Sequence, residues 1–246
     1  MALLLEILTV ICLAICVAAR VPSITRRDTS PYIPKYRISP IDNSTIALPS
    51  QEQLAFQDKE IGVIIHFEIA TYISDPSLDG CNNVPTLVPN QTLFDPTLLN
   101  TDQWMDTITS LGARYATLVA KHNCGFTTWP SDVTFQTTGN EIIHYNYTIA
   151  QSPVSGQNVV KSFVDSAEKY NVGHGFYYSV VVNNFLNVQN SEVRTTPLSP
   201  GQVGITESTY DQIVLDQLTD LWKNYGNLTE VISPKLKTVE FPLTRS

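Results

Sequence analysis

The sequence has few of the features that mark several common classes of protein. It holds 4 cysteines in 246 residues, and Cys12 and Cys16 lie in the apolar first segment. The remaining pair, Cys81 and Cys124, could form one disulfide in an oxidising compartment, although two separate thiols are the preferred interpretation. No cysteines and histidines have the spacing of a zinc-ligand set. No glycine-rich phosphate loop follows a predicted strand, which argues against a nucleotide-binding domain.

Positive charge is also scarce. The chain carries 15 Lys and Arg against 23 Asp and Glu, a net charge of −8. An acidic balance argues against a surface that binds nucleic acid phosphates. It fits a soluble secreted protein with a solvated surface, and it selects no partner. Because 43% of the residues are hydrophobic, the composition can build a core.

Long apolar runs are missing after the first residues. Residues 1–19 form one such run, and Val17 and Ala19 suit the small-residue positions of a signal peptidase site. The run is short for a membrane span, and polar sequence follows it. We therefore predict a cleaved signal peptide, with an uncleaved anchor as the alternative. The chain is expected to be secreted, with no membrane span after cleavage.

Four sequons of the Asn-x-Ser/Thr type agree with this secretory route. Each motif alone is a weak signal, but four of them behind a leader indicate a glycosylated surface. The predicted acceptors are Asn43, Asn90, Asn146 and Asn227.

The chain divides into segments of different composition. Residues 20–50 are rich in Pro, Ser, Thr and Arg and have no hydrophobic periodicity, so we predict an extended segment or linker. Regular apolar patterns begin at residue 51. We predict a folded domain over residues 51–231 and a separate tail over residues 232–246.

Three strand-and-helix units follow one another within the predicted domain. The strands are nearly continuous apolar runs, typical of strands buried on both faces, at residues 61–67, 113–122 and 174–181. Amphipathic helices are predicted at residues 101–112, 158–170 and 208–225, the first with Thr101 or Asp102 as its cap. This order implies an α/β protein with a parallel sheet. The spacing fits both a closed barrel and an open sheet.

The strand ends carry motifs that are more specific in combination. Ile-Gly-Val-Ile-Ile-His-Phe at 61–67, Ala-Lys-His-Asn-Cys-Gly-Phe at 120–126 and Gly-Phe-Tyr-Tyr-Ser at 175–179 follow in order. With Phe94-Asp95-Pro96 and Asn224-Tyr225-Gly226, they resemble the α-L-fucosidases of glycoside hydrolase family 29, particularly the plant and fungal-like branch, over roughly residues 55–231. The resemblance implies an incomplete (β/α)8 TIM barrel of about the first three βα units.

The resemblance also implies an activity. The family consists of retaining glycosidases that remove terminal α-L-fucose from glycans and glycosides, with one carboxylate as nucleophile and a second as acid/base. It implies no metal and no organic cofactor. The expected substrate is therefore a fucosylated glycan or glycoside, and no oligomeric state is indicated.

Three residues take positions that bind sugar in this family. His66 and His122 each end a strand, where the resemblance implies hydrogen bonds to fucose hydroxyls; an imidazole can both donate and accept such bonds. Alternation of side chains along a strand supports the placement of His66 on the inner face of the sheet. The same alternation selects Tyr177 rather than Tyr178 as the pocket tyrosine.

The resemblance stops before the catalytic residues. In the family, the fourth strand carries a Trp-Phe-Asp-Gly-like motif whose Asp is the nucleophile, and this sequence has no such motif after Val231. The acid/base residue, expected further downstream, is also missing. Neither Glu230 nor Glu240 is expected to replace the nucleophile. The chain is therefore expected to be truncated and inactive, with no catalytic residue of its own.

Two other functions remain open at the level of sequence. A non-catalytic fucose-binding or carbohydrate-binding protein would need only the three sugar-binding residues. A different barrel glycosidase could use carboxylates such as Glu68 or Asp132, but no carboxylate pair stands at matching strand ends. His144 and His174 match no family position, and we interpret both as structural.

Overall fold

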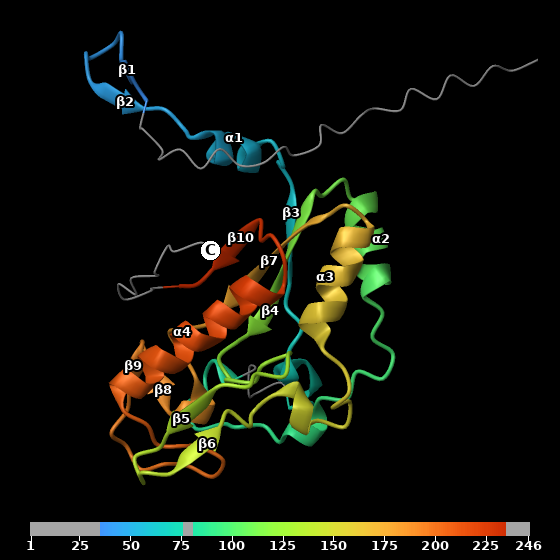
Figure 1. The fold of residues 1–246 in the computed structure, drawn as a ribbon, viewed down its shortest axis with the longest axis vertical. Helices are drawn as coiled ribbons and strands as arrows, with labels where there is room; N and C mark the ends of the chain where they lie inside the picture. Colours follow the sequence, from blue (N-terminus) through green and yellow to red (C-terminus); the bar gives the residue numbers. More distant parts are fainter. Residues whose placement is uncertain (1–34, 76–80, 235–246) are drawn as a thin grey trace, which may run out of the picture. The chain divides into compact units, whose positions relative to one another are not determined.

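The computed structural model describes residues 35–75 and 81–234 (Figure 1). It divides into two compact units, Met1–Ser50 and Gln51–Ser246. In the first unit, β1 (Tyr36–Ile38) and β2 (Thr45–Ala47) pair as an antiparallel hairpin. The predicted signal peptide at residues 1–19 lies outside the described residues, as do Glu240 and the tail beyond residue 234.

The second unit is built on a parallel sheet of four strands (Figure 1). Two of them, β3 (Gly62–Ile65) and β4 (Tyr115–Lys121), lie within the predicted strand segments. A third, β7 (Gly173–Tyr178), begins one residue before the predicted strand at 174–181 and ends three residues before its end. The fourth, β10 (Glu230–Ile232), pairs in parallel with β7, and the order across the sheet is β10, β7, β4, β3. The sheet therefore extends one strand beyond the three units expected from the sequence.

The three predicted helices are confirmed. They are α2 (Thr101–Ser110), α3 (Val159–Lys169) and α4 (Glu207–Asn224), and a shorter helix, α1 (Gln51–Gln57), precedes β3. The prediction that Thr101 or Asp102 caps α2 is wrong. Asn100 has the extended backbone of a cap, and its side chain accepts a hydrogen bond from the Gln103 amide. The Thr101 hydroxyl is instead buried and donates to the Ser162 carbonyl of α3.

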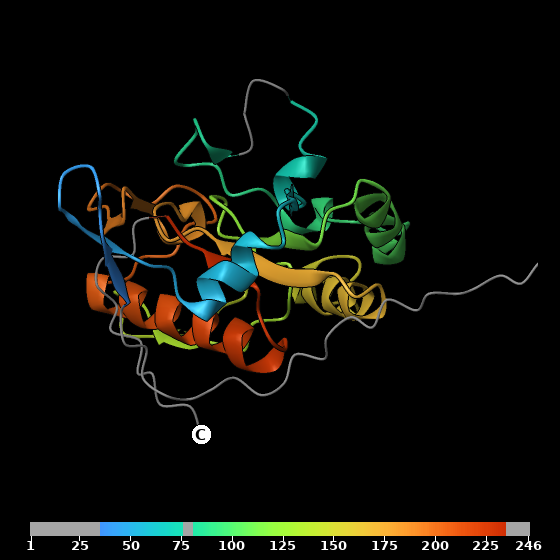
Figure 2. The same cartoon turned by 90° about the horizontal axis from the view of Figure 1, so that it is seen from above.

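Helices α3 and α4 cover the same face of the sheet (Figure 2). The ring of Phe163 in α3 lies 6.3 Å from that of Phe176 in β7, and the Tyr178 hydroxyl donates to Gln217 in α4. The buried side chains of α3 include Val160, Phe163, Val164 and Ala167, and those of α4 include Ile213, Val214, Leu218 and Leu221. On the opposite face of β3, Ile64 is 62% exposed. The sheet thus has one packed face and one partly open face.

Several short elements in the connections were not predicted from the sequence. They are the hairpins β5 (Thr134–Gln136) with β6 (Ile142–His144) and β8 (Val188–Gln189) with β9 (Glu192–Val193), and the 3₁₀ turns Ile69–Tyr72, Gln91–Leu93, Ile149–Gln151 and Asn184–Leu186. Such elements are too short to carry a readable hydrophobic period. None of the helices in the described ranges is long and apolar enough to span a membrane.

A disulfide joins the segment after β3 to the segment after β4. Cys81 and Cys124 are bonded, with their Cα atoms 5.3 Å apart across 43 positions of sequence. The interpretation of two separate thiols is therefore wrong. Sequence separation gives no measure of this distance, which only the packing of the two segments brings within bonding range.

The structure confirms an α/β protein with a parallel sheet. The proposal that this sheet is part of a (β/α)8 barrel stays a prediction.

Candidate functional site

Two predicted site residues meet where β3 and β4 end. The strands are parallel neighbours with Ile65 opposite Leu118, so their carboxyl ends lie at the same edge of the sheet. His66 follows β3 directly and His122 follows β4 directly. Their rings lie 4.4 Å apart, edge to face. The pairing of the strands therefore brings the two histidines into contact.

Tyr177 extends this row of side chains onto the next strand. Its ring lies 5.7 Å from that of His122, and it is partly exposed on the open side of β7. Tyr178 is fully buried on the opposite side, where its hydroxyl donates to Gln217 at 2.6 Å. The structure thus places Tyr177, and not Tyr178, beside the histidines, as side-chain alternation predicts.

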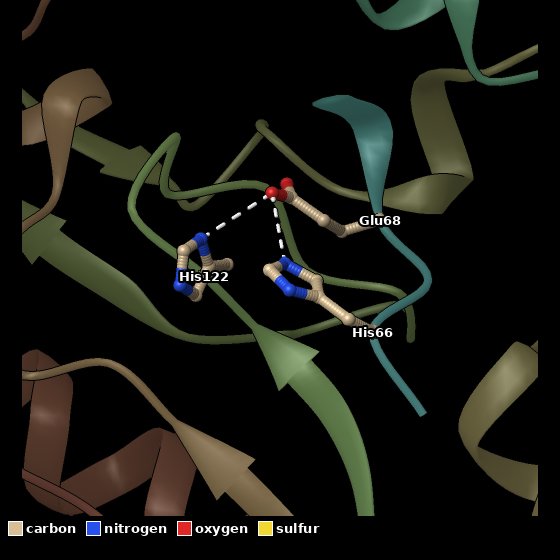
Figure 3. Close-up of side chains that lie close together, drawn as sticks. All are labelled: His66, Glu68 and His122. Atoms are coloured by element: carbon tan, nitrogen blue, oxygen red, sulfur yellow. Dashed lines mark ion pairs between the residues drawn. The ribbon is translucent and has the colours of Figure 1, made fainter. Parts of the chain in front are cut away.

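A carboxylate lies between the two histidines (Figure 3). Glu68 Oε1 is 3.5 Å from His66 Nε2 and 3.4 Å from His122 Nδ1. The Glu68 side chain is only 1% exposed, and neither of its oxygens forms a hydrogen bond. His122 Nδ1 also has no hydrogen-bond partner. His66 is 52% exposed, so the cluster is open to solvent on its side.

The charges in this cluster are coupled. Burial by itself raises the pKa of Glu68, but the imidazoles of His122 and His66 outweigh it, and the pKa lies below its usual value. The same Glu68 carboxylate raises the pKa of His66 above its ordinary value, against a smaller effect of burial. Glu68 is therefore an anion at neutral pH, held between two imidazoles.

A second ionisable group is enclosed beneath the site. Lys121 precedes His122 and is fully buried, with its amine donating to the Ser179 carbonyl and lying 4.3 Å from the centre of the Tyr178 ring. Burial lowers the pKa of Lys121 to about 7, and the negative charge of Glu68 opposes part of that shift. A share of this lysine is therefore neutral at physiological pH.

The other carboxylates raised by the sequence lie elsewhere. Asp132 is exposed on the loop before β5 and is not part of the cluster. Glu230 stands opposite Gly175 in the sheet, two residues below the level at which Ile232 faces Tyr177. It accepts a hydrogen bond from the Thr117 hydroxyl. Glu68 is thus the one carboxylate that contacts the two site histidines among residues 35–75 and 81–234.

The two remaining histidines are outside the cluster. His174 is buried, and its Nε2 lies 2.8 Å from the Tyr225 carbonyl, a contact that fits a structural role. His144 is exposed at the end of β6.

All four predicted glycosylation sites are exposed asparagines. The side-chain oxygen of Asn90 accepts a hydrogen bond from the Thr92 amide, which leaves its amide nitrogen, the atom that carries a glycan, free of that bond. Glycosylation itself stays a prediction for Asn43, Asn90, Asn146 and Asn227.

Fold and site together are those of an α/β protein with a binding site for a polar ligand at one edge of its parallel sheet. Helices cover one face of a parallel sheet, and polar side chains from three adjacent strands gather at its carboxyl edge, the usual location of ligand sites in such sheets. Two imidazoles, a carboxylate and a phenol offer both hydrogen-bond donors and acceptors to a polar ligand.

Comparison with known proteins identifies the family. The family model described as alpha-L-fucosidase matches residues 88–232, more than half of the chain. Alpha-L-fucosidase 1 of Arabidopsis thaliana is 26% identical over 186 residues, which cover 76% of this chain and 30% of that protein. The chain belongs to the α-L-fucosidase family, as the strand-end motifs predict.

Solved structures share the fold. A crystal structure from Bacteroides thetaiotaomicron assigned as an α-L-fucosidase has a TM-score of 0.60 and 25% identity, over 75% of this chain and 40% of the other. A glycoside hydrolase 29 family member from a rumen bacterium has a TM-score of 0.53 and 26% identity, over 75% of this chain and 27% of the other. The chain thus spans well under half the length of these relatives.

Proposed function

We propose that this chain provides the fucose-binding part of an α-L-fucosidase active site, in a family that hydrolyses terminal α-L-fucose with retention of configuration. The observation that carries the proposal is the row of His66, His122 and Tyr177 at the carboxyl edge of adjacent parallel strands. These are the residues that the family resemblance assigns to sugar binding. We also propose that the sheet is part of a (β/α)8 barrel, because that is where the family places these strand ends.

Glu68 supports sugar binding through the two imidazoles. An ionised carboxylate only accepts hydrogen bonds, so a ring nitrogen that faces it is best protonated. His66 Nε2 and His122 Nδ1 are the nitrogens that face Glu68. The other nitrogen of each ring is then an acceptor for a sugar hydroxyl. In this way Glu68 would fix the orientation and the tautomer of both histidines.

Hydrolysis requires two carboxylates near the glycosidic bond. Glu68 is the carboxylate in contact with both histidines, and at the carboxyl end of β10 the next described residues are Ser233 and Pro234. Neither can act as a carboxylate nucleophile. We therefore propose that the 246-residue chain binds fucose without hydrolysing fucosides. A protein that only binds fucose would use the same residues, but the match to hydrolases favours the enzyme family.

The binding proposal is tested with the purified 246-residue chain and methyl α-L-fucoside, by titration calorimetry or NMR, in buffer that contains EDTA. We expect saturable binding that His66→Ala weakens about tenfold or more, equivalent to about 1.4 kcal/mol. Tyr177→Phe should weaken binding as well. Tyr178→Phe is the matched control, because it removes a hydroxyl from the buried side of the same strand. Absence of binding by the folded wild-type chain would refute the proposal.

The proposal that the chain does not hydrolyse fucosides is tested separately. Nitrophenol release from nitrophenyl α-L-fucoside by the same 246-residue preparation would show that the chain holds a nucleophile of its own, and it would contradict that part of the proposal alone.

We also propose that the chain follows the secretory route. Its four exposed sequon asparagines and the Cys81–Cys124 disulfide support this proposal, because disulfides persist mainly in oxidising compartments. Expressed in secreting eukaryotic cells, the chain should appear in the medium and lose apparent mass on treatment with an N-glycan-removing enzyme. Retention in the cytosol, or secretion without any change in mass, would contradict it.

A further inference from the structure

The cluster of His66, Glu68 and His122 has a geometry that sugar binding does not require. One nitrogen of each ring and one oxygen of the carboxylate lie within 4.8 Å of one another. The oxygen is 3.5 Å from one nitrogen and 3.4 Å from the other. Two ligands each about 2.0–2.1 Å from a tetrahedral metal ion are about 3.3–3.4 Å apart. Both separations therefore fit ligands of one shared ion with little movement.

Atoms of the same cluster lack the hydrogen bonds that buried polar groups normally form, which indicates room for a bound ligand. Glu68 is almost fully buried, and neither carboxylate oxygen forms a hydrogen bond; His122 Nδ1 lacks one too. Burial of an ionised carboxylate is costly unless the charge is paired and its oxygens are hydrogen-bonded or coordinate a metal. The contacts with the two rings are at ion-pair distance, longer than good hydrogen bonds. A cation between the three residues would satisfy the atoms that the protein leaves without hydrogen bonds.

The donor set indicates the class of ion. Two imidazole nitrogens with one carboxylate oxygen suit zinc and similar divalent transition metals, whereas magnesium and calcium prefer oxygen ligands. The His66 side chain is half-exposed, so solvent water can reach an ion bound to it.

We propose that His66 Nε2, Glu68 Oε1 and His122 Nδ1 form a binding site for a divalent transition metal ion of the zinc type. The ligands lie just beyond the ends of two neighbouring strands, with His66 and Glu68 two residues apart after β3 and His122 directly after β4. The family resemblance implies no metal, so the site goes beyond the proposed function. It shares two histidines with the fucose pocket but uses the nitrogens that face Glu68.

The test uses the 246-residue chain without a polyhistidine tag, stripped with EDTA and then dialysed free of it. Titration with Zn²⁺ near neutral pH should show one equivalent bound, and Co²⁺ should give the visible absorption of a coordinated ion. Excess Mg²⁺ should not displace either ion. Glu68→Gln, which keeps the size of the side chain, and His122→Ala should each weaken Zn²⁺ binding about tenfold or more.

His144→Ala is the control, because His144 is an exposed histidine outside the cluster. The Zn²⁺ affinity of this variant should equal that of the wild type. Circular dichroism verifies the fold of each variant, and Glu68→Gln keeps the test decisive if His122→Ala does not fold. Absence of Zn²⁺ binding, or equal binding by Glu68→Gln, would overturn the site. Since fucose binding is measured in EDTA, the two proposals fail independently.

Discussion

Lys121 and Glu68 are two buried ionisable groups at the candidate site, and the charge of Glu68 acts on Lys121. Both side chains are almost fully enclosed. Burial disfavours the charged form of each. The charge of Glu68 offsets part of that penalty for Lys121, and the imidazoles of His122 and His66 offset it for Glu68. The carboxyl edge of the sheet therefore contains a small buried network of charges.

Lys121 gives the stability of the chain a characteristic pH dependence. Its pKa is lowered to about 7 in the folded chain from 10.5, so the unfolded chain binds more protons between these values. Stability should therefore rise with pH across this window and level off below about pH 7. Relative to Lys121→Met, the wild type should gain at most about 1.4 kcal/mol per pH unit.

Urea unfolding of the metal-free proteins at several pH values between about 7 and 10 measures this difference. The comparison of slopes removes the constant effect of the substitution on packing and on the contact with Ser179. Parallel curves for the two proteins would mean that Lys121 keeps an ordinary pKa.

Some residues of the site could be predicted from the sequence, and one could not. The family resemblance selects His66, His122 and Tyr177, and strand ends and side-chain alternation, which are local properties, support their placement. At the level of sequence Glu68 is only an alternative catalytic carboxylate, although it stands two residues after His66 and therefore on the same face of an extended chain. Its backbone is indeed extended, with φ −152°. Its position between two histidines depends on β4, which the local pattern around Glu68 does not describe.

At the scale of elements, α2 illustrates how a helix start is decided. Asn100 has an extended backbone, and its side chain accepts a hydrogen bond from the Gln103 amide. Asn100→Ala leaves that amide without its partner and should lower the free energy of unfolding by about 1 kcal/mol. Leu98→Ala is the control, because Leu98 is 93% exposed and should contribute little.

Chemical denaturation of both variants measures the effect. Equal stability of Asn100→Ala and the wild type would show that α2 needs no side-chain cap.

The lengths of the elements were predicted less well than their order. The predicted strand at residues 61–67 is observed only from Gly62 to Ile65, and His66 already lies beyond it. Strand ends depend on hydrogen bonds with neighbouring strands, whereas an apolar run continues into residues that pack without pairing. Helices α2, α3 and α4 lie within two residues of their predicted bounds, because helical periodicity and capping are read within one segment.

At the scale of the whole molecule, the Cys81–Cys124 disulfide is the main covalent constraint among the described residues. It closes a loop over 43 positions and links segments that follow two neighbouring strands. Replacement of both cysteines by serine should lower stability by about 2–4 kcal/mol, since a loop of this length costs the unfolded chain about 4 kcal/mol of entropy at most.

Denaturation with and without a thiol reductant is the corresponding measurement. The double serine variant should be insensitive to the reductant and should match the reduced wild type. A wild-type midpoint that does not move on reduction would contradict a stabilising role.

The sequence by itself determined the three strand-and-helix units, the parallel sheet and the histidines at the strand ends, because each follows from a pattern within one segment. Only the tertiary structure decided the fourth strand, the disulfide and the place of Glu68. β10 is three residues long and exists through its pairing with β7. Cys81 meets Cys124, and Glu68 meets His122, across more than forty positions. Such contacts depend on how distant segments pack, which no local pattern of residues encodes.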